Sequence, residues 1–280
     1  MTAPKERRTL RSVSIHFMWE ALPMPERVRA AAAAGFDLVD LWDWRNVEID
    51  EIARAAAESG IGINGFFGNR AFSACDPAQR TAFLNEVKES LACAVRVGAR
   101  QLHLFSNAIR PGGVVAPSPA LSPALLHAAC VDAVSELAPL AAEAGVVLVL
   151  EHLNDVHLPG YLWTGAQSVI DVARDVDHPN VRVVFDAFHQ QLGTGRLAEH
   201  LIAAMPYLGR VDIAGVPGRH EPGVGEIDFA YLRGVLDEHG WRGTVTFEVV
   251  PSDGNPETAV RRIEEFFPAA WCGQREQVRA

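Results

Sequence analysis

The chain has 280 residues, of which 49% are hydrophobic and 21% are charged, and its formal net charge is −10. This acidic balance, with lysines and arginines scattered along the chain, argues against a nucleic-acid partner. No segment approaches the roughly 20 consecutive apolar residues of a membrane span, and the amino terminus lacks a secretory signal, so we expect a cytoplasmic protein without a membrane partner. The four cysteines form no C-x-x-C pair, which favours buried or incidental thiols.

Apolar, β-branched runs alternate with helical patterns along the chain. The predicted strands are residues 12–17, 36–42, 61–67, 99–105, 146–152, 181–187, 209–215 and 243–249. The predicted helices are residues 25–34, 48–59, 77–97, 121–144, 165–175, 196–205, 229–239 and 256–267. Five of these helices close on a glycine that fits the left-handed position after a helix end: Gly35, Gly60, Gly98, Gly145 and Gly240.

Eight strands that alternate with eight helices predict an α/β fold of the (β/α)₈ TIM-barrel type, because the strands are too uniformly apolar to face water. A doubly wound open sheet is the competing fold, but no G-x-G-x-x-G follows the first strand. We expect a single domain over residues 1–280, with a core of about 12–268 and a short tail. Pro-Gly-Gly at 111–113 is expected to form a loop after the fourth strand.

An acidic residue stands at the downstream end of each of the last four predicted strands, namely Glu151, Asp186, Asp212 and Glu248. In a barrel the carboxyl ends of the strands share one edge, where four carboxylates are stable only around a cation. Hard divalent ions such as Mg²⁺ and Mn²⁺ prefer carboxylate oxygens, so the sequence predicts a metal site. For any single acid the alternative is a solvated rim residue or a helix N-cap.

Several segments resemble the hydroxypyruvate isomerase family, within the xylose isomerase-like barrel group that also holds ketose 3-epimerases and endonuclease IV. They are EHLNDVHLPGYLWT at 151–164, DAFHQQ at 186–191, VDIAGVPGRHEPGVGEIDF at 211–229 and FEVVP at 247–251. The resemblance implies that Glu151, Asp186, Asp212 and Glu248 hold one divalent ion, Mg²⁺, Mn²⁺ or Co²⁺. It also implies that Glu151 and Glu248 move a proton, that the substrate is a small sugar or hydroxy-keto acid, and that a homo-oligomer is a common state.

Four further residues are candidates for substrate binding. His189 follows Asp186 by three residues, as in the family's D-x-x-H-x-Q pattern. Arg219 would bind a substrate carboxylate or oxyanion by a bidentate contact, and Glu221 lies in the same loop; the alternative is a weak surface pair between the two. His103, on the fourth strand, either points into the barrel near the site or packs elsewhere.

Two positions depart from the family pattern. Isomerases that act on hydroxypyruvate generally have glutamine where this chain has Asp212, and epimerases have histidine. The family's arginine after the D-x-x-H-x-Q segment is replaced by Leu192. Both changes make the site more negative, which leads to the hypothesis of a substrate larger or less charged than hydroxypyruvate, such as a keto sugar or a derivative.

The expected function is a divalent-metal-dependent isomerase that transfers a proton through an enediolate, of the aldose–ketose type. A ketose 3-epimerase is the alternative with the same chemistry. An endonuclease IV-like phosphodiester hydrolase would need several metal ions, more histidine ligands and a basic groove. A noncatalytic accessory barrel that binds sugars is the remaining alternative, and the presence of both Glu151 and Glu248 argues against it.

Overall fold

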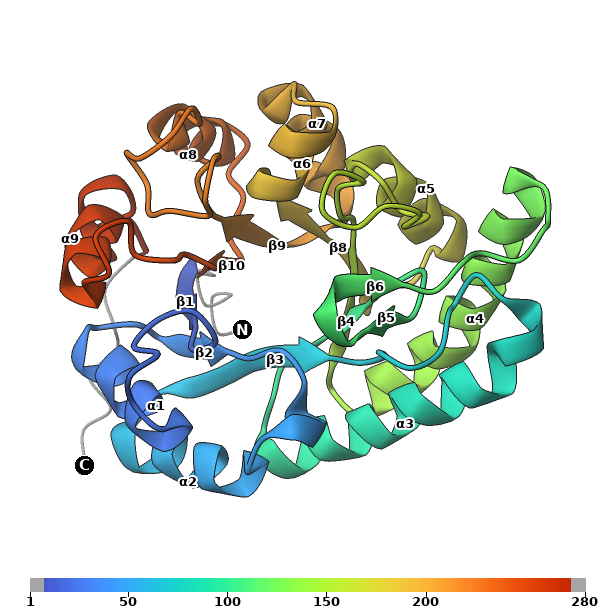
Figure 1. Ribbon diagram of the computed structural model, residues 1–280, viewed down its shortest axis with the longest axis horizontal. Helices are drawn as coiled ribbons and strands as arrows, with labels where there is room; N and C mark the ends of the chain where they lie inside the picture. Colours follow the sequence, from blue (N-terminus) through green and yellow to red (C-terminus); the bar gives the residue numbers. More distant parts are fainter. Residues whose placement is uncertain (1–7, 273–280) are drawn as a thin grey trace, which may run out of the picture.

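The strands form one closed parallel barrel in the computed structural model, which describes residues 8–272 (Figure 1). Around the barrel the order is β1-β10-β9-β8-β7-β4-β3-β2, and β2 pairs with β1 to close it. This confirms the predicted TIM barrel and its eight strands. Their bounds are β1 (Leu10–Ser14), β2 (Leu38–Asp40), β3 (Gly62–Phe67), β4 (Gln101–Leu104), β7 (Val147–Glu151), β8 (Val181–Asp186), β9 (Leu208–Ile213) and β10 (Thr244–Phe247).

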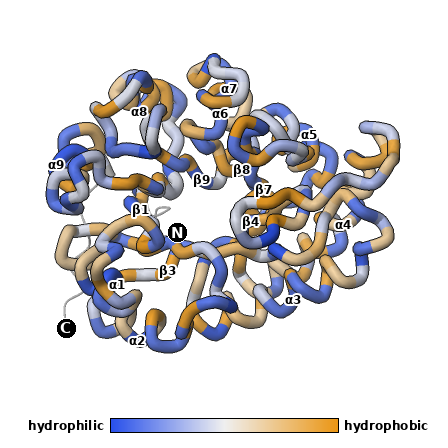
Figure 2. The backbone as a smooth tube through the Cα atoms, viewed as in Figure 1, coloured by the Kyte–Doolittle hydropathy of each residue, from blue (hydrophilic) through white to orange (hydrophobic). Residues whose placement is uncertain are grey.

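The helices form a ring outside the barrel (Figure 1). They are α1 (Met24–Ala33), α2 (Ile49–Ser59), α3 (Arg80–Val97), α4 (Pro123–Glu143), α5 (Ala166–Val176), α6 (Ala187–Gly193), α7 (Leu197–Ala204), α8 (Phe229–Glu238) and α9 (Pro256–Phe266). Along α2 and α9 hydrophilic and hydrophobic residues alternate, as expected of helices that bury one face (Figure 2). Eight of the nine correspond to predicted helices, whereas the short α6 was not predicted.

Helix α4 is the one described helix that is long and apolar enough, by length and composition, to cross a membrane. In the structure it packs against α3, α5 and β7 as part of the outer ring. Its inner face is buried through Leu126, Val134 and Leu137. The apolar character of α4 therefore fits a helix that covers the barrel.

A short hairpin follows β4, where the sequence predicted only a loop. It consists of β5 (Ile109–Arg110) and β6 (Val114–Val115), joined by a single 3₁₀ turn over Pro111–Gly113. Gly112 and Gly113 both have positive φ, at 78° and 75°, a conformation that glycine adopts without strain. The hairpin brings Ile109, Gly112 and Gly113 to the wall of the cavity described below.

The cysteines follow the sequence-based expectation where the structure describes them. Cys75, Cys93 and Cys130 are buried and form no disulfide. The side chain of Cys272 and the tail from residue 273 onward lie outside the described residues, as do residues 1–7.

Candidate active site

The four predicted acids lie at the carboxyl end of the barrel. Glu151 and Asp186 are the last residues of β7 and β8, Asp212 is the next-to-last of β9, and Glu248 directly follows β10. Asp186 and Asp212 are register partners across β8 and β9. All four carboxyl groups are buried, with at most 7% of each residue exposed. Parallel pairing thus explains why residues far apart in the sequence share one site.

Within the described residues, Glu151, Asp186 and His189 form a compact group in which one potential ligand atom from each residue lies within 4.8 Å of the others. Asp186 caps helix α6, because its Oδ1 accepts the backbone N–H of His189 at 2.9 Å. Its other oxygen, Oδ2, is buried and has no hydrogen-bond partner among residues 8–272. An unpaired buried carboxylate oxygen beside a second carboxylate is the donor set of a hard divalent cation, so this group fits a metal ion.

Burial makes the two carboxyl groups costly to ionise without a cation. Burial, and then the charge of Glu248, raise the pKa of Glu151 to about 8. Burial also raises the pKa of Asp186 to about 7, although the nearby Arg219 opposes this effect. Both shifts are of the kind that a bound cation reverses, since it favours the charged carboxylates.

Binding of Mn²⁺ is expected to release about one to two protons at a pH of about 6.5, because the carboxylates must ionise to hold the ion. Both folded-state pKa values lie above the ordinary values of 4.5 and 3.8. The stability that these groups give the metal-free protein is therefore full below the ordinary values and is lost as the pH rises through about 7 to 8. Calorimetric titration in two buffers of different ionisation enthalpy measures the protons released.

The matched variant is Asp186→Asn, which removes one of the two carboxyl groups. It should bind the ion more weakly, and binding should release fewer protons. Thermal unfolding of the metal-free protein between pH 5 and pH 8 gives the second reading, a stability that falls with rising pH by on the order of a few kcal/mol. Proton release near zero together with a flat stability profile would contradict this interpretation of the carboxyl pair.

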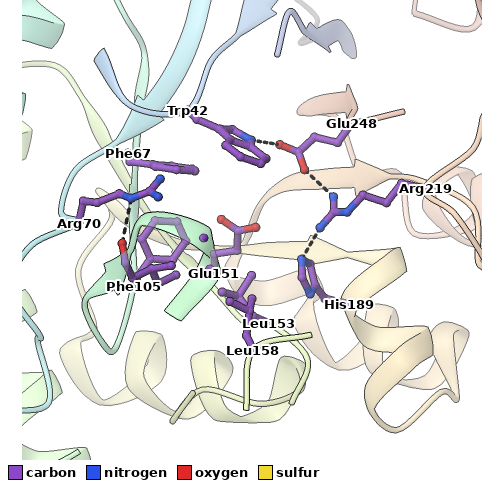
Figure 3. Close-up of a pocket in the computed structure, with 13 residues that line it drawn as sticks. Trp42, Phe67, Arg70, Phe105, Glu151, Leu153, Leu158, His189, Arg219 and Glu248 are labelled. Atoms are coloured by element: carbon purple, nitrogen blue, oxygen red, sulfur yellow. Dashed lines mark hydrogen bonds and ion pairs between the residues drawn. The ribbon is translucent and has the colours of Figure 1, made fainter. Parts of the chain in front are cut away.

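Glu248 is held by two neighbours and lines the same cavity as Glu151. Its Oε1 accepts Nε1–H of Trp42 at 3.2 Å, and its Oε2 accepts Nη1–H of Arg219 at 2.8 Å (Figure 3). Burial acts to raise the pKa of Glu248, but the charges of Arg219 and Arg210 outweigh it and the pKa is lowered. The two glutamates therefore have pKa values that their surroundings push in opposite directions, a common property of acid and base pairs.

His189 and Arg219 present two hydrogen-bond donors to each other. Nδ1 of His189 accepts the backbone N–H of Asn154 at 3.1 Å. Burial and the charge of Arg219 hold the pKa of His189 well below its usual range, so the neutral ring carries its proton on Nε2. Nη2 of Arg219, also a donor, lies 2.7 Å from that nitrogen. A single oxygen in reach of both nitrogens could accept from both, so the contact of His189 with substrate stays a prediction that this tautomer fits.

Arg210 fills the barrel interior and is fully buried. It points to the same face of β9 as Asp212, two residues later, and binds both carboxylate oxygens of that residue, at 2.5 and 2.9 Å. Its Nη1 also donates to Asp40 on β2, at 2.5 Å. Asp212 can therefore coordinate a cation only through its remaining lone pairs, and its role as a fourth ligand stays a prediction.

His103 connects this buried arginine to Glu151. Nη1 of Arg210 lies 2.6 Å from Nε2 of His103, and a guanidinium can only donate, so Nε2 is the acceptor. Burial and Arg210 lower the pKa of His103 to about 4, so the ring is neutral with its proton on Nδ1. Nδ1 donates to Oε2 of Glu151 at 2.7 Å. The tautomer of His103 thus fixes one oxygen of Glu151 and leaves Oε1 for other partners.

Glu221 does not line the cavity. Its two oxygens accept the backbone N–H of Ser252, at 2.9 Å, and the hydroxyl of the same residue, at 2.6 Å. The surface pair with Arg219, considered as an alternative, is not formed, because Arg219 binds Glu248 instead. Glu221 joins the loop after β9 to the loop after β10, and its predicted contact with substrate stays a prediction.

The cavity has a volume of about 370 Å³ and a largely aromatic and aliphatic wall. Trp42, one of three tryptophans near the first two strands, lines it, whereas Trp44 bonds Ser90 away from it. Sequence reasoning missed Arg70, which also lines it. The polar and charged members of the lining are Trp42, Arg70, Glu151, His189, Arg219 and Glu248, and the remainder are Phe67, Phe105, Ile109, Gly112, Gly113, Leu153 and Leu158.

A parallel (β/α)₈ barrel with buried carboxyl groups and a cavity at the carboxyl ends of its strands has the architecture of TIM-barrel enzymes. The model of one family within this class, the xylose isomerase-like TIM barrels, matches residues 28–268. The chain belongs to this family, which confirms the resemblance seen in the sequence.

The chain is similar in sequence to proteins that are named as isomerases, and in structure to a solved barrel. A human protein with the provisional name hydroxypyruvate isomerase is 30% identical over 242 residues, which cover 81% of this chain and 84% of that protein. The 2-oxo-tetronate isomerase of Cupriavidus necator is 28% identical, over 87% of this chain and 93% of that protein. A crystal structure of a protein named AP endonuclease, family 2, from Brucella melitensis, is 27% identical with a TM-score of 0.81, over 92% and 99% of the two chains.

Proposed function

We propose that this protein is a divalent-metal-dependent isomerase that moves a proton between neighbouring carbons of a small keto acid or sugar, through an enediolate. The enzyme class follows from the family and from relatives named as hydroxypyruvate and 2-oxo-tetronate isomerases. One observation carries the proposal: Glu151 and Glu248 line one cavity with the facing donors of His189 and Arg219. A proton acceptor and donors for a developing oxyanion are what enediolate chemistry requires.

Glu151 and Asp186 would hold the ion, with Glu248 and Asp212 as the further predicted ligands. When bound, Mg²⁺, Mn²⁺ or Co²⁺ would polarise the carbonyl and the neighbouring hydroxyl and so acidify the carbon-bound proton. The Oδ2 of Asp186, which has no hydrogen-bond partner among the described residues, is one atom that such an ion would contact.

The two glutamates would exchange the proton. Glu248 is oriented by Trp42 and kept ionised by Arg219, so it can accept a proton from one carbon. Glu151 is oriented by His103 through Oε2, so its other oxygen can deliver or accept the proton at the neighbouring carbon. His189 and Arg219 would donate to the substrate oxygen that gains negative charge, and the apolar wall would limit access of water.

The alternatives differ in where the proton returns or in which bond is broken. A ketose 3-epimerase would use the same glutamates and return the proton to the carbon that lost it. The Brucella melitensis protein is named as an endonuclease, but hydrolysis of DNA needs several metal ions and a basic groove. Within residues 8–272 the site offers one compact group of potential ligands, and its cavity has two arginines against two glutamates.

Exchange of carbon-bound hydrogen tests the proposal. Chelator-treated protein in deuterated water is expected to exchange no hydrogen of hydroxypyruvate, 2-oxo-tetronate or neutral ketoses, as measured by proton NMR. Added Mn²⁺, Mg²⁺ or Co²⁺ should raise the exchange rate by at least roughly 10²-fold. A shifted carbonyl would indicate an isomerase, and an inverted centre an epimerase. Exchange that is equally fast with chelator, or absent over the whole panel with every ion, would contradict the proposal.

A further inference from the structure

Arg70 is the cation of the cavity that has no carboxylate partner within the described part of the chain. The other lining cation, Arg219, is already bound to Glu248. The guanidinium of Arg70 uses Nε to donate to the backbone carbonyl of Ile109, at 2.9 Å, and lies 5.6 Å from the centre of the Phe67 ring. Its two Nη groups make no hydrogen bond to the described residues, and a guanidinium offers donors only.

The loop that carries Arg70 is held rigidly. The carboxylate of Glu86, on α3, accepts the backbone N–H groups of Arg70, Ala71 and Phe72, at 2.8, 2.9 and 3.1 Å. The backbone N–H of Ile109 donates to the carbonyl of Arg70 at 3.0 Å, and the side-chain contact runs the opposite way. The hairpin and the loop after β3 thus fix the guanidinium before any ligand arrives, which lowers the entropic cost of binding.

The position of Arg70 in the cavity indicates what it binds. Arg70 and Arg219 lie on opposite sides, with Glu151 between them (Figure 3). A volume of about 370 Å³ lies at the small end of the range of roughly 300–1,000 Å³ that small-molecule sites occupy. A chain of four to six carbons with its oxygens fits a site of this size. A fixed guanidinium at the far end matches a carboxylate or a phosphate, both of which arginine binds through paired N–H groups.

We propose that Arg70 binds the anionic terminal group of a four- to six-carbon keto substrate, a sugar acid or a sugar phosphate, whose other end lies at Glu151 and His189. The inference rests on the proposed function and names its substrate class. Of the two sequence-based alternatives, a substrate larger or less charged than hydroxypyruvate, the inference keeps the larger substrate. It departs from the less charged one, because it places an anionic group at Arg70. The aromatic side chains of Phe67 and Phe105 would cover the carbon chain between the two ends.

Equilibrium binding of unreactive ligands tests this assignment without turnover. Calorimetry in saturating Mn²⁺ compares erythronate and erythritol 4-phosphate with the neutral erythritol. The wild-type protein is expected to bind the preferred anion at least tenfold more tightly than erythritol. Arg70→Gln should weaken binding of that anion by roughly 10–100-fold and leave erythritol unchanged, because a hydrogen bond to a charged group is lost. Arg70→Lys, which keeps the charge but not the paired donors, should lie between.

The control is Arg110→Gln, which removes an exposed arginine from the same hairpin and should bind all three ligands like the wild type. The carboxylate and phosphate arms show which anion the site prefers. Equal binding of the anions by wild type and Arg70→Gln, with both folded by circular dichroism, would overturn the inference, as would a wild-type preference for erythritol. Anion selectivity without hydrogen exchange on any substrate would remove the proposed isomerase and leave the Arg70 site standing.

Discussion

Replacing Arg210 with methionine is expected to destabilise the folded protein by roughly 3–5 kcal/mol, because it leaves buried carboxylates without a counter-charge. Arg210 is fully buried and contacts Asp40, Asp212 and His103. Methionine keeps an unbranched aliphatic stem but is shorter than arginine, so part of the loss comes from the space it leaves. Equilibrium unfolding in urea at constant metal concentration measures the difference in free energy of unfolding.

Two comparisons isolate the charge. Adding Asp40→Asn and Asp212→Asn to the Arg210→Met protein removes the stranded charges and is expected to recover part of the loss. Arg242→Met is the matched control, since this arginine pairs with Asp237 at 3.5 Å on an exposed surface, where such a pair contributes about 0–1 kcal/mol. A loss of unfolding free energy below about 1 kcal/mol for Arg210→Met would contradict this prediction, because the buried carboxylates would then not depend on the charge of Arg210.

Replacing Glu151 with glutamine is expected to lower the rate of substrate hydrogen exchange by at least roughly 10³-fold, because the change removes the proposed proton-transfer group and a charge that would hold the ion. Glutamine keeps the size of the side chain and can still accept from Nδ1–H of His103. The fold should therefore survive, and its stability should rise at high pH, since a carboxyl group whose pKa is raised is removed. Proton NMR of the substrate in deuterated water measures the rate.

Measured affinity for Mn²⁺ distinguishes the two proposed roles of Glu151, proton transfer and metal binding. If Glu151→Gln binds Mn²⁺ as tightly as the wild type yet exchanges no hydrogen, the residue acts on the proton. If the affinity falls and saturating Mn²⁺ restores exchange, it acts as a ligand. Glu226→Gln, which changes an exposed glutamate bound to Gln191, is the matched control and should behave as wild type. Exchange within tenfold of wild type in Glu151→Gln without added metal would exclude both roles.

The barrel could be predicted from the sequence because each of its strands is a short apolar run between helical patterns. The parallel strands are buried on both sides, and they therefore lack the polar alternation that would have complicated their assignment. The hairpin of β5 and β6 could not be predicted, since two-residue strands around Pro111–Gly113 are too short for any periodicity. Helix α6 was missed for a similar reason, because it has only seven residues and begins at Ala187, directly after β8, without a loop.

The site was predictable in part. Acids at strand ends gave the location of the cavity and of the compact group, but not which partners each acid takes. Arg210 carried a signal that could have been used: it lies two residues before Asp212 in a buried strand, so both side chains must share a face. No such spacing in the sequence connects the site to Asp40, on another strand, or to Arg70, on a loop. Contacts across the barrel depend on the strand register, which a single sequence does not give.

The pairing of β1 with β10 joins Leu10 to Thr244, almost the full length of the described chain. At about 5–20 residues per second, a ribosome needs roughly 10–50 seconds between the two. During this interval β1 has an unpaired edge, which is a template for association with other nascent chains. Glu248 follows β10 directly, so this glutamate reaches the cavity only as the last gap in the sheet closes.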